Sequence, residues 1–148
     1  MKNSRHLARE LAVQGLYEWL VSGNEALAIE RRLTEVKSFE KADRPLLDAL
    51  LNGVIREARD LEARLTPLLD RKASALSPVE HAVLLVGAYE LLYGRETPYR
   101  VVINEAVELA KSYGGTDGHK YVNGVLDRLA SELRAVEVKA ASEAQAPR

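Results

Sequence analysis

The sequence predicts an all-α protein of about seven helices in two packed helical sub-bundles. Every long apolar pattern has the helical period, as in the stripe that runs from Leu46 to Leu61. Residues that favour helix ends stand at the limits of these patterns. No alternating run is long enough to indicate a strand, and the short run at 100–103 continues directly into a helical pattern.

The first two helices have recognisable ends. Asn3 or Ser4 can cap a helix that ends at Gly23-Asn24, because glycine readily adopts the left-handed conformation that closes a helix. A thinner apolar stripe from Ala26 to Val36 predicts a second helix.

The third segment begins at Asp43, which is followed by a proline that fits the first turn of a helix. We expect one continuous helix through the stripe from Leu46 to Leu61. Thr66-Pro67 interrupts it, and the leucines at 65–69 predict a short further helical segment.

The residues from Ser77 to Glu80 form a capping box with a proline at the first helical position. The helix that they open is apolar on nearly every side as far as Gly94, so we expect it to be the central buried helix.

Two more helices follow, from Thr97-Pro98 to Gly114-Gly115 and from about Asp117 to Leu133. Residues 138–148 have nothing left to bury and predict a disordered tail. We therefore expect a single domain over residues 1–137, with sub-bundles at about 1–65 and 77–135.

Composition limits the function. The chain has 148 residues, a formal net charge of −1 and no cysteine, so it is no polycation and forms no disulfide or thiolate metal site. Its N-terminus is interrupted by charges at Arg5, Arg9, Glu10 and Glu18, unlike a signal peptide, and no apolar run is long enough to span a membrane. We expect a soluble cytoplasmic protein.

Catalysis and metal binding have no support in the sequence. His6, His81 and His119 show no i,i+4 spacing, and no histidine–carboxylate cluster has the spacing of metal ligands. The glycines at 114, 115 and 118 follow a helix and lack the lysine of a phosphate-binding loop. We predict no catalytic residue, metal or cofactor.

Basic side chains gather at the N-terminus. Lys2, Arg5 and Arg9 precede the first acid, and the i,i+4 spacing of the two arginines places them on one helix face. They can contact phosphates, or they can be ordinary solvated residues.

The elbow between the last two helices combines aromatic and charged groups. Tyr113 and Tyr121 can stack on bases, while Lys120 beside the helix N-terminus can hold a phosphate. The alternative is that one tyrosine belongs to the core and that Asp117 only caps the helix.

Four motifs carry a resemblance to a known family. They are R-x-x-A-R-x-x-A-x-Q-x-L-Y at 5–17, SPVE-x-A-V-L at 77–84, YEL at 89–91, and PYRVVINEAVELAKSYG with HKYVNGVLD between 98 and 127. Together they resemble the NusB family of bacterial transcription antitermination factors. The resemblance covers nearly the whole chain up to about residue 135.

The resemblance implies an all-helical protein with two sub-bundles. It also implies binding to the boxA element of ribosomal RNA leader transcripts, as a heterodimer with NusE, a ribosomal protein of the small subunit. That assembly helps RNA polymerase read through terminators. The matching RNA-binding positions are Lys2, Arg5, Arg9, Tyr113, Asp117, Lys120 and Tyr121, and the matching partner-binding positions are Tyr17 and Glu80.

This chain departs from the family pattern in two places. Its N-terminus has fewer arginines than some relatives, and both elbow rings are tyrosine where phenylalanine is familiar. We therefore expect weak RNA binding by this chain alone and tighter binding with a partner.

Two other function classes stay open. Similar helical domains precede some ribosomal RNA cytosine methyltransferases, although the sequence has no Rossmann-like segment. A structural, self-associating helical protein is the other class, and a homodimer could bury the same RNA surface.

Overall fold

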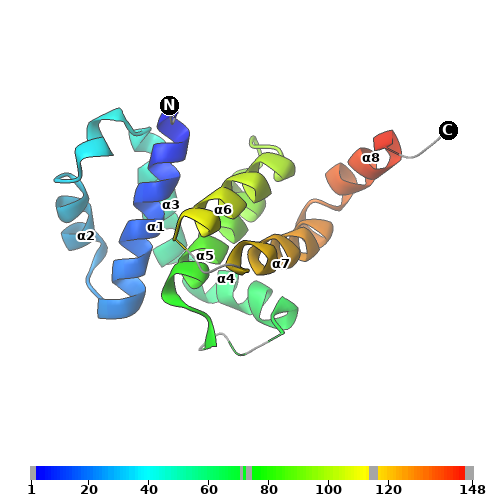
Figure 1. Cartoon of the computed structure of the whole chain (residues 1–148), viewed down its shortest axis with the longest axis horizontal. Coiled ribbons are helices and arrows are strands. Elements are labelled where there is room, and N and C mark those ends of the chain that lie inside the picture. Colours follow the sequence, from blue (N-terminus) through cyan, green and yellow to red (C-terminus); the bar gives the residue numbers. More distant parts are fainter. Residues whose placement is uncertain (1–2, 71, 73–74, 114–116, 146–148) are drawn as a thin grey trace.

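The computed structural model describes residues 3–70, 72, 75–113 and 117–145 (Figure 1). This part of the chain contains helices and no strand, which confirms the predicted class, with eight α-helices rather than about seven. The elements are α1 (Ser4–Ser22), α2 (Ala26–Leu33), η1 (Lys37–Lys41), α3 (Arg44–Arg56), α4 (Ala58–Leu65), η2 (Thr66–Leu68), α5 (Pro78–Tyr93), α6 (Tyr99–Tyr113), α7 (Gly118–Leu133) and α8 (Ala135–Gln145), where η marks a 3₁₀ helix.

The local end signals are confirmed. The Asn3 side chain accepts the amide hydrogen of His6 at 2.8 Å, and the Asp43 side chain accepts that of Leu46 at 3.0 Å. Gly23 closes α1 with a φ of 72°, a left-handed conformation that favours glycine.

The capping box at α5 is made differently from the expected one. Ser77 Oγ accepts the amide hydrogen of Glu80 at 3.1 Å, as expected. The Glu80 carboxylate, however, accepts a hydrogen bond from the Ser77 hydroxyl at 2.8 Å, whereas a reciprocal box would use the Ser77 amide. Glu80 is therefore held at the first turn of α5 through the hydroxyl of its cap.

Two predictions of secondary structure are wrong. The expected helix through Leu46–Leu61 breaks at Glu57, whose φ of −99° and ψ of 14° separate α3 from α4. This break lets α4 contact α5, α7 and η2. Residues 138–145 form most of α8 instead of a disordered tail, and Val138 packs against the core.

α5 is the central helix, as predicted. It contacts α1, α3, α4, α6 and α7, and its side chains from Ala82 to Val86 are at most 3% exposed. In Figure 1, α1, α2 and α3 lie on one side of α5. On its other side lie α6 and α7, and α8 extends away from the rest of the molecule. No helix within the described ranges is both long and apolar enough to cross a membrane.

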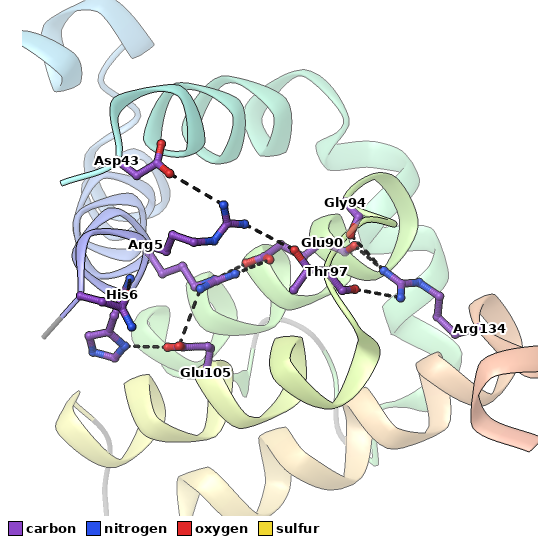
Figure 2. A network of polar contacts seen from close by, with 10 residues as sticks. Arg5, His6, Asp43, Glu90, Gly94, Thr97, Glu105 and Arg134 are labelled. Atoms are coloured by element: carbon purple, nitrogen blue, oxygen red, sulfur yellow. Dashed lines mark hydrogen bonds and ion pairs between the residues drawn. The ribbon is translucent and has the colours of Figure 1, made fainter. Parts of the chain in front are cut away.

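Arg134 closes the C-terminal end of α5 from the start of α8. Its buried guanidinium donates hydrogen bonds to the carbonyls of Glu90, Leu91, Gly94 and Thr97 at 2.8–3.2 Å (Figure 2). The Leu91 carbonyl lies in the last turn of α5 and has no partner within that helix, whereas the carbonyls of Glu90 and Gly94 also accept the amide hydrogens of Gly94 and Thr97.

A contact between α8 and α6 completes this joint. Arg134 pairs with Glu137 at 2.8 Å, and Glu137 accepts the amide hydrogen of Tyr99 at 2.7 Å. Desolvation acts to raise the pKa of Glu137, but the hydrogen bonds from Tyr99 and Arg134 outweigh it and lower the pKa. α8 is thus anchored at its first turn.

We expect Arg134→Ala to lower the free energy of unfolding by about 3 kcal/mol, because it leaves the carbonyls of Leu91 and Thr97 without donors and removes a second donor from those of Glu90 and Gly94. Arg134→Lys should recover less than half of this loss, since an ammonium group lacks the planar fork of donors. Urea denaturation measures both values. Arg128→Ala, at an exposed arginine of α7, is the control and should change the stability by less than about 0.5 kcal/mol. An equally small loss for Arg134→Ala would contradict the capping role.

Candidate nucleic-acid interface

The N-terminus of α1 presents Arg5 at the surface. Its side chain is 48% exposed, and its guanidinium lies 3.8 Å from Asp43 and 3.4 Å from the Thr97 hydroxyl (Figure 2). Exposed contacts of this kind contribute little stability, so a phosphate can compete for Arg5. Lys2 lies outside the described residues.

Arg9 does not share this exposure. It is 2% exposed, and its guanidinium donates two hydrogen bonds to the Glu90 carboxylate, at 2.7 and 2.9 Å. Burial opposes the charge of Arg9, but the hydrogen bond and charge of Glu90, with Glu105 3.7 Å away, raise its pKa. The predicted phosphate contact of Arg9 conflicts with this burial, because a surface phosphate does not reach a guanidinium enclosed between α1 and α5.

His6 stands between two carboxylates on the same side of α1. Its Nδ1 lies 2.6 Å from Glu105 of α6, and its Nε2 lies 3.5 Å from Glu10 (Figure 2). The basic face predicted for α1 is therefore interleaved with one acid from α1 itself and one from α6, which reduces its attraction for a phosphate chain.

Side chains also bridge α1 and α6 further along. Gln14 Nε2 donates a hydrogen bond to the Tyr113 hydroxyl at 3.2 Å. Residue 6 thus meets residue 105 and residue 14 meets residue 113, so the two helices run in the same direction with a constant offset. Arg5 and the elbow consequently lie at opposite ends of one surface, roughly 13 Å apart along α1.

The two elbow tyrosines differ in burial. Tyr113 is 39% exposed at the end of α6, where its ring is available for stacking. Tyr121 is partly buried and packs against the hydrophobic core from the first turn of α7. The alternative that one tyrosine belongs to the core therefore fits Tyr121.

The charged residues of the elbow are both open to solvent. Lys120 Nζ lies 3.6 Å from Asp117, with side chains 75% and 81% exposed. Asp117 occupies the position before α7, but its side chain makes no capping hydrogen bond, so the expected cap is wrong. The glycines at 114–115 lie outside the described residues.

Tyr17 and Tyr113 line one cavity of about 360 Å³, together with Val13 and Gln14 of α1 and Val79 of α5. Tyr17 is 43% exposed there. The other lining residues, Val13, Gln14, Arg32 and Val79, were not predicted as site residues, although Gln14 lies one turn before Tyr17 on the same helix face.

The Glu80 turn adjoins the elbow. A Cβ atom placed on Gly118 would lie 3.4 Å from Glu80 Oε2, so the first turns of α5 and α7 are close neighbours. The predicted partner residues, Tyr17 and Glu80, thus flank the predicted RNA residues of the elbow instead of forming a separate site.

One protein family matches most of the chain. The sequence model of the NusB family matches residues 6–131. The chain belongs to the NusB family.

Relatives in this family match almost the whole chain. The transcription antitermination protein NusB of Nitrosomonas europaea is 57% identical over 138 residues, which are 93% of this chain and 83% of the relative. The protein of the same name from Paraburkholderia phymatum is 57% identical over 145 residues, which are 98% of this chain and 100% of the relative.

Solved structures share the NusB fold. T. maritima NusB superposes with a TM-score of 0.78 at 28% identity, covering 94% of this chain and 99% of that one. A crystal structure of the antitermination factors NusB and NusE in complex with dsRNA gives a TM-score of 0.76 at 23% identity, covering 89% of this chain and 99% of that one. At 23% identity, the similarity to this second structure shows the fold alone.

In this NusB-family protein, we expect Arg9→Met to lower the free energy of unfolding by about 3–5 kcal/mol, because it leaves the Glu90 charge buried and unpaired. The double variant Arg9→Met with Glu90→Leu should lose less than Arg9→Met alone, since neither charge then remains. Urea denaturation measures both. Arg59→Met on α4, where the arginine is exposed, is the control for the substitution itself. A stability loss in Arg9→Met no larger than in the control would contradict the structural role of the pair.

The two elbow tyrosines should also differ in how much they contribute to the stability of the fold. We expect Tyr121→Ala to lower the free energy of unfolding by more than about 2 kcal/mol, because its ring packs against the core. Tyr113→Ala should cost less than about 1 kcal/mol, because its ring is partly exposed. Thermal and urea denaturation distinguish the two, and equal losses would contradict the assignment.

Proposed function

We propose that this protein is a transcription antitermination factor. It binds the boxA element of ribosomal RNA leader transcripts together with NusE and acts within the antitermination complex of RNA polymerase. Membership of the NusB family supports this function, and two of the relatives above are transcription antitermination proteins. The proposed role is that of a cytoplasmic, non-enzymatic adaptor.

The observation that carries the RNA-binding part is the exposed Tyr113 ring, whose hydroxyl accepts a hydrogen bond from Gln14 of α1, together with the exposed Lys120 in the first turn of α7. A single-stranded RNA can stack a base on Tyr113 and place phosphates near Lys120 and Arg5. Lys2 is the further cation proposed from the sequence, and Asp117 and Tyr121 complete the elbow.

Arg9 is excluded from the proposed phosphate contacts by its ion pair with Glu90. The remaining cations are Lys2, Arg5 and Lys120. Three neutralised phosphates correspond to a slope of log affinity against log salt of about −2 for a single strand. Such a small electrostatic contribution supports weak binding by the chain alone.

We propose that NusE docks beside the RNA, against Tyr17 and the Glu80 turn. Tyr17 lines the same cavity as Tyr113, and Glu80 adjoins the first turn of α7. A partner at this position extends the RNA surface without covering Arg5 at the far end of α1. We propose that the site belongs to a single helical domain that includes α8 beyond residue 137, because Val138 packs against the core.

Fluorescence anisotropy of boxA RNA, measured across salt with and without NusE, tests the proposal. We expect weak binding alone with a slope of about −2, and tighter binding with NusE, because the partner adds surface to the same RNA. Arg5→Ala should reduce the slope by about 0.7, the value for one phosphate on a single strand.

Arg59→Ala is the matched control, since it removes an exposed arginine from α4. An affinity that NusE leaves unchanged would refute the partner dependence, and a slope that Arg5→Ala leaves unchanged would refute its phosphate contact. Sedimentation with and without the RNA shows whether a homodimer dissociates on binding.

A further inference from the structure

A second cavity, of about 340 Å³, lies between α6 and α7 and shares no lining residue with the cavity at Tyr17 and Tyr113. Its lining is mostly polar. It consists of Tyr99, Arg100, Ile103 and Asn104 from α6 and of Asn123 and Asp127 from α7. Most of these residues belong to the two motifs at 98–127 that resemble the family pattern, yet the proposed RNA surface uses none of them.

The walls of this cavity are preformed. α6 and α7 pack closely along their length, and Ile103 is 4% exposed. At the start of α6, Glu137 of α8 accepts the amide hydrogen of Tyr99 at 2.7 Å. A ligand would therefore meet a fixed surface and would not have to order it.

Two carboxamides on this surface are available to a ligand. Asn104 and Asn123 are exposed, and neither side chain hydrogen-bonds to another of the described residues. Each carboxamide has one acceptor and two donors, which matches the donor and acceptor of a peptide group. Carboxamides on adjacent helices can thus hold an extended peptide backbone.

Asp127 supplies a negative charge at the same place. Its carboxylate forms no ion pair within the described ranges, and desolvation by its surroundings raises its pKa. Arg100 lines the same cavity but forms no hydrogen bond or ion pair with Asp127 in the described part of the chain, and its Nε donates to the Tyr99 hydroxyl at 3.4 Å. A ligand cation would compensate the carboxylate, and arginine can do so with two parallel hydrogen bonds.

Gly124 lies between these two α7 residues and has no packing reason to be glycine. A Cβ atom placed on it would meet only the end of Arg128, at 4.0 Å. At Gly87 of α5, by contrast, a Cβ atom would lie 2.7 Å from Leu126, so that glycine is required by the core. Glycine within a helix lowers its stability, so Gly124 points to a close approach from outside the chain.

We propose that the cavity between α6 and α7 binds an extended segment of a partner protein. An arginine of the segment pairs with Asp127, its backbone hydrogen-bonds to Asn104 and Asn123, and it approaches the α7 backbone at Gly124. A nucleobase is the other ligand that carboxamides can read, but Asp127 would repel the phosphates attached to it. The proposal does not depend on the RNA-binding function.

Nuclear magnetic resonance of the whole ¹⁵N-labelled chain tests the proposal. The probe is a blocked pentapeptide with arginine between glycines, compared with the same peptide carrying citrulline, which is neutral and similar in shape. We expect the arginine peptide to shift the side-chain signals of Asn104 and Asn123 and the amide of Gly124, with at least about tenfold higher affinity than the citrulline peptide. Equal shifts for the two peptides, or none, would overturn the proposal. Shifts caused by guanosine monophosphate alone would overturn it in favour of RNA.

Substitutions locate the contact. Asp127→Asn should lower the affinity for the arginine peptide about tenfold, the loss of one charge-assisted pair. Glu35→Gln removes a negative charge from an exposed position between α2 and η1 and is the matched control, with unchanged affinity.

Gly124→Ala distinguishes binding from folding. It should raise the melting temperature, because alanine is the better helix former and its methyl group meets open space, and yet it should weaken peptide binding. If Asp127→Asn or Gly124→Ala bound the arginine peptide as tightly as the unmodified chain, the proposed contact would be wrong.

Discussion

Glu90 takes part in both sets of buried polar contacts in the interior, those of Arg9 and those of Arg134. Its carboxylate holds the buried guanidinium of Arg9 from α1, and its backbone carbonyl accepts a hydrogen bond from the buried guanidinium of Arg134 at the start of α8. Glu90 of the central helix thus joins α1 to the junction between α7 and α8. Loss of either partner of the Arg9–Glu90 pair would leave a buried charge uncompensated, which is costly.

This joint also sets the register of the surface. Apolar side chains between α1 and α5 would tolerate a small shift along the helix axis, but a two-point hydrogen bond between Arg9 and Glu90 does not. With this register, Gln14 reaches the Tyr113 hydroxyl and Tyr17 lies beside Val79. The cavity at the elbow is therefore a consequence of a buried ion pair about one and a half turns away along α1.

Local signals predicted the helix ends at Asn3, Gly23, Asp43 and Ser77, because capping depends on residues that are adjacent in sequence. The break at Glu57 was not predictable in this way, since the apolar period continues across it and only the packing of α4 on α5 shows it. The i,i+4 spacing of Arg5 and Arg9 placed both on one side of α1, but it did not predict that the carboxylate of Glu90 pairs with Arg9. α8 was missed because its alanines and glutamates favour a helix but bury little apolar surface. The residues that anchor it, Arg134 and Glu137, bond to residues far away in the sequence, Leu91 and Tyr99.

The charges that remain on the proposed RNA surface give a physical reason for the proposed dependence on a partner. Arg5 already faces Asp43, and Lys120 already faces Asp117, so an arriving phosphate replaces one negative partner with another. These exposed pairs cost little to break, but the exchange also gains little. Most of the affinity must then come from stacking on Tyr113 and from surface that a second protein adds. In the proposed arrangement, a protein that docks at Glu80 lies beside the first turn of α7 and can contact the same RNA.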